Sequence, residues 1–230
     1  MIFDILCDSL KYTFSNPKNI LKLGILELFS VFLIPAFFVS GYQYRIIDHS
    51  LSSVIGGDVQ MVELNGFNEL FFNGLKVYAV KVIYLLIPLL LMFVLNLDFI
   101  HGALDFILFA ILFVLAFSYG YIAIAHMVKK NSFKKAFNLN EINHIILNQI
   151  GLRLIFGVLI GFIVIYSGLG VFLDDFVSFL NLFITADITI FSFSIDLAGI
   201  VTMIIFGLFV QPFLHILVAR IVGMVYMDFD

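Results

Sequence analysis

Charged residues are scarce in this sequence, and their scarcity excludes an ordinary soluble domain. Only 12% of the 230 residues are charged, whereas 63% are hydrophobic, and the mean hydropathy is +1.15. A soluble domain is typically about 45 to 50% apolar and about 25% charged. A soluble core of this composition would leave too few polar residues to cover its surface, so lipid must be the solvent for much of the chain. The sequence therefore predicts one transmembrane domain over residues 1–230.

Other absences narrow the function. The single cysteine, Cys7, excludes an intramolecular disulfide. No serine, cysteine or histidine lies in a recognisable nucleophile motif, and neither a glycine-rich phosphate loop nor a paired-cysteine metal site is present. We therefore expect no enzyme activity, no cofactor and no metal. Nucleic-acid binding is not expected either, because the net charge is -4. The first residues carry Asp4 and Asp8 rather than the basic start of a signal peptide.

Five apolar runs approach or exceed the length that a helix needs to cross a bilayer, about 20 residues for about 30 Å of hydrocarbon. Runs such as Tyr84 to Leu95 are apolar on every face, which argues against the alternating strands of a membrane barrel. We expect an all-α, polytopic transmembrane helical bundle in the cell membrane. Amphipathic helices are predicted near residues 2–13 and 132–149, lying in the membrane interface; the first could equally dock on the bundle. The five segments are residues 20–41, 77–97, 104–128, 150–173 and 197–222.

The positions of the basic residues predict the orientation of these segments. Lysine and arginine near span ends are retained on the cytoplasmic side. Four lysines between residues 129 and 135 place that loop inside, whereas the stretches 96–103 and 174–196 have no lysine or arginine and are predicted to be external. The first segment conflicts with this scheme, because basic residues flank both of its ends. Pro35, in its middle, favours a broken or re-entrant hairpin over a simple crossing.

Ionisable groups inside apolar runs are the first candidates for function, because a charge in hydrocarbon is costly and is normally paired or faces a polar cavity. In the hairpin arrangement, Glu27 and Lys81 lie at similar depths, so they could form a buried pair that joins the first two segments. Two alternatives stay open. Lys81 could extend to the interface while Glu27 reaches interfacial water, or the two residues could belong to a proton or substrate relay.

Three further groups of residues are weaker candidates. Asp98, His101 and Asp105 share one helical face and could hold a metal or a proton, although a solvated external rim explains them as well. Gln211 and His215, spaced i and i+4 beside Pro212, could bind a neighbouring helix or a ligand. Gly157 and Gly161 form a small-xxx-small step that suits packing within the chain or a homodimer face.

A set of short motifs follows in order along the chain. They are Leu10-Lys11-Tyr12-Thr13-Phe14-Ser15-Asn16-Pro17-Lys18 with Leu21 and Gly24, Gly41-Tyr42 with Arg45, Glu69-Leu70-Phe71 before Gly74-Leu75-Lys76, Tyr84 with Pro88, Ala136-Phe137 with Glu141-Ile142, and Arg220 with Gly223 and Tyr226. Together, over nearly the whole chain, they resemble the mostly archaeal membrane family called domain of unknown function 4013. The chain departs from that pattern at Gly56-Gly57-Asp58-Val59-Gln60, where an acidic stretch followed by Leu-Pro would stand. The resemblance implies the architecture and no activity.

Three functions remain open at this stage. The leading one is a non-enzymatic membrane protein that acts by binding or assembly, with the lipid bilayer, a second copy of the chain or another membrane protein as its partner. The second is a small permease or channel for an ion, lipid or small solute, suggested by Glu27, Lys81, Gln211 and His215. A membrane-embedded lipid enzyme is third. A transporter needs a polar cavity at membrane depth, whereas an assembly protein does not.

Overall fold

The described residues fold almost entirely into helices. The computed structural model describes residues 2–54, 56–57, 60–94, 103–150, 177–178, 187–190 and 193–227. The predicted all-α class is confirmed, with one antiparallel two-stranded hairpin in addition. The elements are α1 (Ile2–Phe14), α2 (Pro17–Leu28), α3 (Leu33–Leu51), α4 (Phe67–Val94), α5 (Ala103–Lys129), η1 (Phe133–Phe137), α6 (Leu139–His144), η2 (Ile145–Ile150), β1 (Asp187–Ile190), β2 (Phe193–Asp196), α8 (Leu197–Ile205), η3 (Phe206–Val210) and α9 (Gln211–Met227).

Three of the described helical stretches are long and apolar enough to cross a membrane. They are Phe67–Val94 (α4), Ile107–Lys129 within α5, and the run from α8 through η3 to α9, Leu197–Met227. These correspond to the second, third and fifth predicted segments. Beyond Ile150, the fourth predicted segment lies outside the described residues, as do Gly157 and Gly161. The predicted count of five is therefore not confirmed by the part of the chain that the structure describes.

The first predicted segment is broken, but not at Pro35. Helix α2 begins at Pro17, with Asn16 as its N-cap and the proline at its first position. It ends at Leu28, and α3 begins at Leu33 after a short break. Pro35 is thus the third residue of α3, where a helix has no internal acceptor for the backbone N–H and a proline is tolerated. The break precedes the proline, which corrects the prediction.

Helices α2 and α3, which this break separates along the chain, pack against each other. The side-chain amide of Asn19, near the start of α2, donates to the backbone oxygen of Val62 at 3.0 Å. The hydroxyl of Tyr42, in the middle of α3, donates to the same oxygen at 2.6 Å. Asn19 and Tyr42 are also within 3.5 Å of each other. The two helices therefore form a hairpin whose turn is the apolar, exposed run from Phe29 to Ile34.

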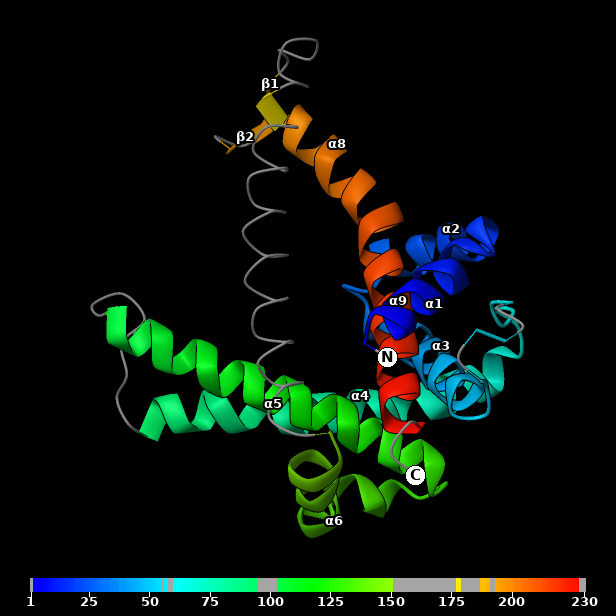
Figure 1. Cartoon of the computed structure of the whole chain (residues 1–230). Coiled ribbons are helices and arrows are strands. Elements are labelled where there is room, and N and C mark those ends of the chain that lie inside the picture. The colour runs from blue at the N-terminus through cyan, green and yellow to red at the C-terminus, as the bar shows by residue number, and fades with distance from the viewer. Residues whose placement is uncertain are drawn as a thin grey trace.

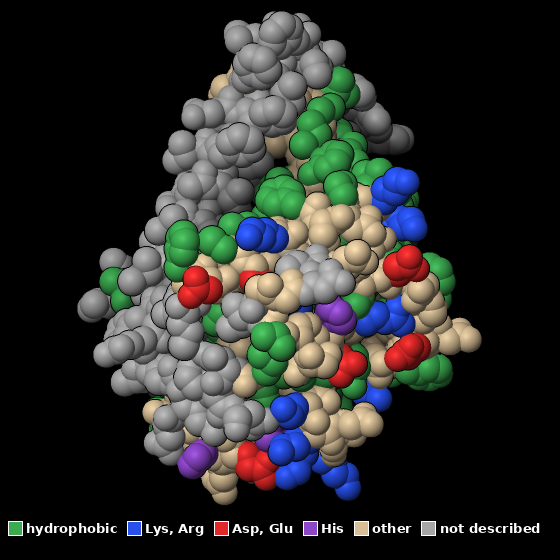
Figure 2. Space-filling view, turned by 45° about the vertical axis from the view of Figure 1, so that its right-hand side comes forward, with side chains coloured by type: hydrophobic (Ala, Val, Ile, Leu, Met, Phe, Trp, Pro, Cys, Tyr) green, Lys and Arg blue, Asp and Glu red, His purple; other side chains and the backbone are tan. Residues whose placement is uncertain are grey.

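The helices form a packed hub with two apolar arms. The hub consists of α1–α3, the first part of α4, the last part of α5, η1, α6 and α9, and it contains most of the buried core. One arm is the far part of the α4–α5 pair, and the other is α8 with η3; Figure 1 shows the two arms extending in different directions. Large apolar side chains are exposed on both, including Phe93, Val94 and Met203. Charged side chains instead gather over the hub, away from α8 (Figure 2).

Glycines permit the closest helix contact in the hub. A Cβ atom added to Gly41 would lie 1.9 Å from the backbone oxygen of Leu70, and one added to Gly74 would lie 1.7 Å from that of Phe37. Helices α3 and α4 therefore cross backbone to backbone at these two positions. Such small-residue crossings are how helices associate where lipid weakens the hydrophobic drive between them.

Helix α1 docks on the hub and also exposes an apolar face. Ile5, Asp8 and Tyr12 are buried, whereas a separate stripe of Phe3, Leu6, Leu10 and Phe14 is exposed. Asp8 lies on the side of the helix that packs on α9. Both predicted roles of the helix, docking and an outward apolar face, are thus present in α1.

Candidate functional site

A buried carboxylate–histidine pair joins α2 to α9 in the hub. Glu27 lies near the end of α2, two residues before the break, and its side chain is 1% exposed. One of its oxygens, Oε1, lies 2.6 Å from Nδ1 of His215, whose side chain is 31% exposed. Gly24 supports this contact from the previous turn of α2, because its missing side chain lets the helix touch the backbone of Leu208.

Lys81 faces the same region from α4 but has a different partner. Its ammonium group donates to Oε1 of Gln43 on α3 and lies 5.6 Å from the centre of the Tyr121 ring on α5. Glu27 and Lys81 are therefore not in the direct contact that was predicted. His215 contacts the Glu27 carboxylate instead, and Gln43 accepts a hydrogen bond from Lys81.

Two buried polar atoms of these residues have no hydrogen-bond partner in the described part of the chain. These are Oε2 of Glu27, an acceptor, and Nε2 of Gln43, a donor. Both residues are more than nine-tenths buried. Among the described residues, no hydrogen bond joins Gln211 to these residues, although it lies one turn before His215. Of the four predicted intramembrane residues, Glu27 and His215 therefore contact each other, whereas Lys81 contacts Gln43, which was not predicted.

A second buried pair, Asp8 with Arg220, joins α1 to α9 and was not predicted. Arg220 is fully buried, and its Nη2 atom lies 2.9 Å from Oδ2 of Asp8. Its Nη1 atom donates to the hydroxyls of Ser50 and Ser53, and its guanidinium group lies 4.5 Å from the centre of the Tyr12 ring. In the sequence, each of the two residues appears only as a charge in a mostly apolar helix, and nothing there indicates that they form a pair.

The basic segment after α5 is held by Glu141. Its Oε2 lies 2.7 Å from Nε2 of His126, and its Oε1 accepts from Lys135 at 2.6 Å and from Asn138 at 2.7 Å. The hydrogen bonds from Lys135 and then from His126 lower the pKa of Glu141 below its usual value. Asn138 is the N-cap of α6, and its side chain accepts from the backbone N–H of Glu141. This cluster fixes the segment against α5, and through Tyr226 against α9.

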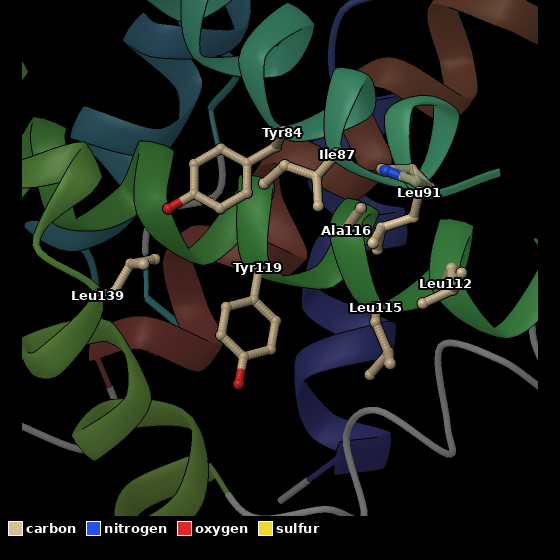
Figure 3. Close-up of a pocket in the computed structure, with 9 residues that line it drawn as sticks. Tyr84, Ile87, Leu91, Leu112, Leu115, Ala116, Tyr119 and Leu139 are labelled. Atoms are coloured by element: carbon tan, nitrogen blue, oxygen red, sulfur yellow. The ribbon is translucent and has the colours of Figure 1, made fainter. Parts of the chain in front are cut away.

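A groove between α4 and α5 is lined mostly by apolar side chains. It encloses about 180 Å³ and is lined by Tyr84, Ile87, Pro88, Leu91, Leu112, Leu115, Ala116, Tyr119 and Leu139. Figure 3 shows Tyr84 and Tyr119 beside Leu139 at one end, and Leu91 and Leu112 at the other. A smaller pocket of about 50 Å³ lies beside Lys81 and Tyr121, with apolar residues forming most of its remaining wall. It has room for water but not for a large solute.

The external cluster predicted from sequence is not tested by this structure. Asp98 and His101 lie outside the described residues, and Asp105 lies in α5 without a described side chain. Within the described part of the chain, no group of three or more histidine, cysteine, aspartate or glutamate residues is arranged to hold a metal ion. The metal alternative therefore stays a prediction.

A comparison with known families gives a match over residues 28–174, more than half of the chain, to the model of DUF4013, described as a protein of unknown function. The chain belongs to this family. No curated protein and no solved structure matches it. The DUF4013 match includes the glycine crossing of α3 and α4 and the Glu141 cluster.

The hub extends beyond the stretch that the DUF4013 model matches. The sequence resemblance covered nearly the whole chain, but the motifs around Pro17 and Arg220 lie outside residues 28–174. Asp8, Glu27, His215 and Arg220 also lie outside it. The Asp8–Arg220 and Glu27–His215 contacts therefore join segments that flank the matched stretch, so α1, α2 and α9 complete the hub around the DUF4013 helices.

Proposed function

We propose that this DUF4013 protein acts in the cell membrane without catalysis, by binding or assembling with lipid or with another membrane protein, including a second copy of itself. The observation that carries the proposal is how the hub uses its buried charges. Asp8 is bound to Arg220, Glu27 to His215 and His126 to Glu141. Within the described residues, these groups connect helices to one another, which favours a scaffold over a permeation path.

The arms supply the surface for this role. Their exposed side chains are apolar, and the hub carries the charges (Figure 2). We place the hub on the cytoplasmic side, because the exposed lysines of α1, α2 and the segment after α5 belong to it. In this arrangement the α2–α3 hairpin inserts only its apolar turn, and the basic residues on both sides of it share one side of the bilayer.

The proposal is tested by purifying the full chain in lipid nanodiscs and determining its mass by native mass spectrometry, together with flux assays in vesicles. We expect defined oligomers or retained lipids, and proton and ion fluxes equal to those of protein-free vesicles. A monomer without bound lipid that speeds the flux of an ion or small solute would contradict the proposal. As a control, the measurements are repeated with Glu141→Gln, which changes a pair outside the arms.

A small permease is the second candidate, and one observation favours it. The unpartnered Oε2 atom of Glu27 is buried at the point where α2 meets α9, and transporters place their sites where helices are interrupted. Under this alternative, Glu27→Gln would abolish a flux that the wild-type protein supports. If the wild type supports no flux above protein-free vesicles, the permease is excluded for the solutes tested.

A further inference from the structure

The groove between α4 and α5 is partly open to its surroundings. Three of the apolar residues in its wall, Ile87, Leu91 and Leu139, are 48%, 39% and 54% exposed. The groove encloses about 180 Å³, and an apolar cavity of roughly 150 Å³ is enough to hold benzene. It therefore has room for a stretch of hydrocarbon chain, and the exposed wall lets such a chain enter from the bilayer.

The two ends of the groove differ in chemistry. Figure 3 shows Tyr84 and Tyr119 beside Leu139 at one end, whereas Leu91 and Leu112 lie at the other. From Tyr84 to Leu91, helix α4 rises about 10 Å at about 1.5 Å per residue, which is about two-thirds of the hydrocarbon of one leaflet. Tyrosine is enriched where the hydrocarbon meets the headgroups. The groove thus has the polarity of a phospholipid, with a polar end at the two tyrosines and an aliphatic end at the leucines.

The tyrosine end of the groove lies against the basic segment after α5. The hydroxyl of Tyr84 donates to the backbone oxygen of Ala136 at 2.8 Å, and its ring stacks on that of Phe137 with 6.3 Å between the ring centres. Lys134, which is exposed, comes two residues before Ala136. The Cα atoms of these two residues are therefore at most about 8 Å apart. A cation is thus present near the end of the groove where a bound phospholipid would carry its phosphate.

The basic segment has an excess of positive charge. Between residues 129 and 148 the sequence has four lysines, and its one acidic residue is Glu141. The carboxylate of Glu141 is already occupied, because it accepts from Lys135 and lies 2.7 Å from His126. Lys134 has no carboxylate partner within the described part of the chain. The charge at this end of the groove therefore complements an anionic headgroup better than a zwitterionic one.

We propose that this groove binds one anionic phospholipid, with an acyl chain between α4 and α5 and the headgroup phosphate beside Lys134. The inference rests on the proposed function and deepens it, because it names the class of lipid and the place where that lipid binds. A zwitterionic lipid would fill the groove equally well with its chain, but its headgroup offers the lysine no net negative charge. The lipid is thus selected at its headgroup and held along its chain.

The chain contains no tryptophan, which gives a direct test by fluorescence. Leu91→Trp introduces a single fluorophore at the aliphatic end of the groove. Leu89→Trp introduces one two residues away on α4, at a position that is 51% exposed and does not line the groove. Each full-length variant is reconstituted in vesicles that mix phosphatidylcholine with phosphatidylglycerol, and each lipid in turn carries bromine on its acyl chains. Bromine quenches a neighbouring tryptophan, so the two series give the ratio of the binding constants of the two lipids at each position.

At Leu91→Trp we expect phosphatidylglycerol to bind about fivefold more tightly than phosphatidylcholine, the preference that one lysine near a phosphate gives. At Leu89→Trp, which faces bulk lipid, the ratio should be close to unity. Adding Lys134→Gln to Leu91→Trp should bring its ratio close to unity as well. Lys18→Gln removes an exposed lysine from α2, which does not line the groove, and should leave the ratio unchanged. Leu112→Trp, at the same end of the groove, replaces Leu91→Trp if that variant does not fold.

Two results would overturn the proposal. The same ratio at Leu91→Trp and Leu89→Trp would show that the groove selects no anionic lipid. A preference that survives Lys134→Gln would show that the phosphate lies elsewhere. Neither result contradicts the proposed function, because the mass and flux measurements described above test that function separately.

Discussion

Replacing Asp8 by alanine should strongly destabilise the hub. The change leaves the guanidinium group of Arg220, which is fully buried, without its only described carboxylate partner. Removing one member of a buried ion pair typically costs about 3 to 5 kcal/mol, because the other charge stays buried and uncompensated. The remaining hydrogen bonds of Arg220 go to the hydroxyls of Ser50 and Ser53, which carry no charge and cannot replace the carboxylate. We therefore expect a loss of about 3 to 5 kcal/mol for Asp8→Ala.

The assay is reversible denaturant unfolding in bicelles, read as the change in free energy at constant m-value. Arg220→Met and the double variant complete a mutant cycle, and the double variant should cost clearly less than the sum of the two single changes. Glu69→Ala provides a matched control. Its partner Arg45 lies 3.1 Å away, but the Glu69 side chain is 69% exposed, and an exposed pair is worth about 0 to 1 kcal/mol.

The reasoning is refuted if Asp8→Ala costs no more than Glu69→Ala, or if the losses in the cycle add. Either result would mean that α1 is not held to α9 through this pair. A dissociated α1 would also leave the hydroxyls of Ser50 and Ser53 as the principal partners of Arg220.

Two further predictions concern the glycine crossing and the basic segment. Gly74→Ala should cost about 1 to 3 kcal/mol in unfolding free energy, because its Cβ would overlap the backbone oxygen of Phe37. Gly120→Ala should be nearly neutral, because its Cβ would lie 3.4 Å from the nearest atom. Equal losses in the two variants would contradict the crossing. The pKa of Glu141 is lowered, chiefly by Lys135, so its stabilisation is complete above the usual value of 4.5 and is lost as pH falls through the lowered pKa. The melting-temperature difference between wild type and Glu141→Gln should therefore shrink at low pH, and a constant difference would contradict the assignment.

The helices were predictable because apolar runs of that length have few other structures available to them. The start of α2 could also be located, since Asn16 and Pro17 carry their chemistry locally. Its end could not. The break at Phe29–Phe32 contains neither glycine nor proline, so the sequence predicted a break at Pro35 instead. The break depends instead on tertiary packing, which brings Leu28 against Gly207 and Glu27 against His215.

The candidate site was predictable in its members but not in its pairing. Glu27, Lys81 and His215 could each be identified as candidates from the sequence, because an ionisable group in an apolar run needs a partner. Which partner it takes depends on how helices distant in sequence cross. Asp8 and Arg220 show the same limit more strongly, since neither position in the sequence indicates that the two residues form a pair. Gln43 was missed because a neutral amide in a mostly apolar helix gives little signal by itself.

The central claim is that α2 and α3 form a re-entrant hairpin, with the hub on one side of the membrane. It is tested by labelling single cysteines with a membrane-impermeant maleimide in a Cys7→Ser background, using sealed vesicles of known orientation. The account predicts that Lys22→Cys and Lys76→Cys, both exposed, are labelled from the same side, and that Val31→Cys, 89% exposed in the protein, is shielded by lipid from either side. Labelling of Lys22→Cys and Lys76→Cys from opposite sides would contradict the account, because the first segment would then cross the bilayer.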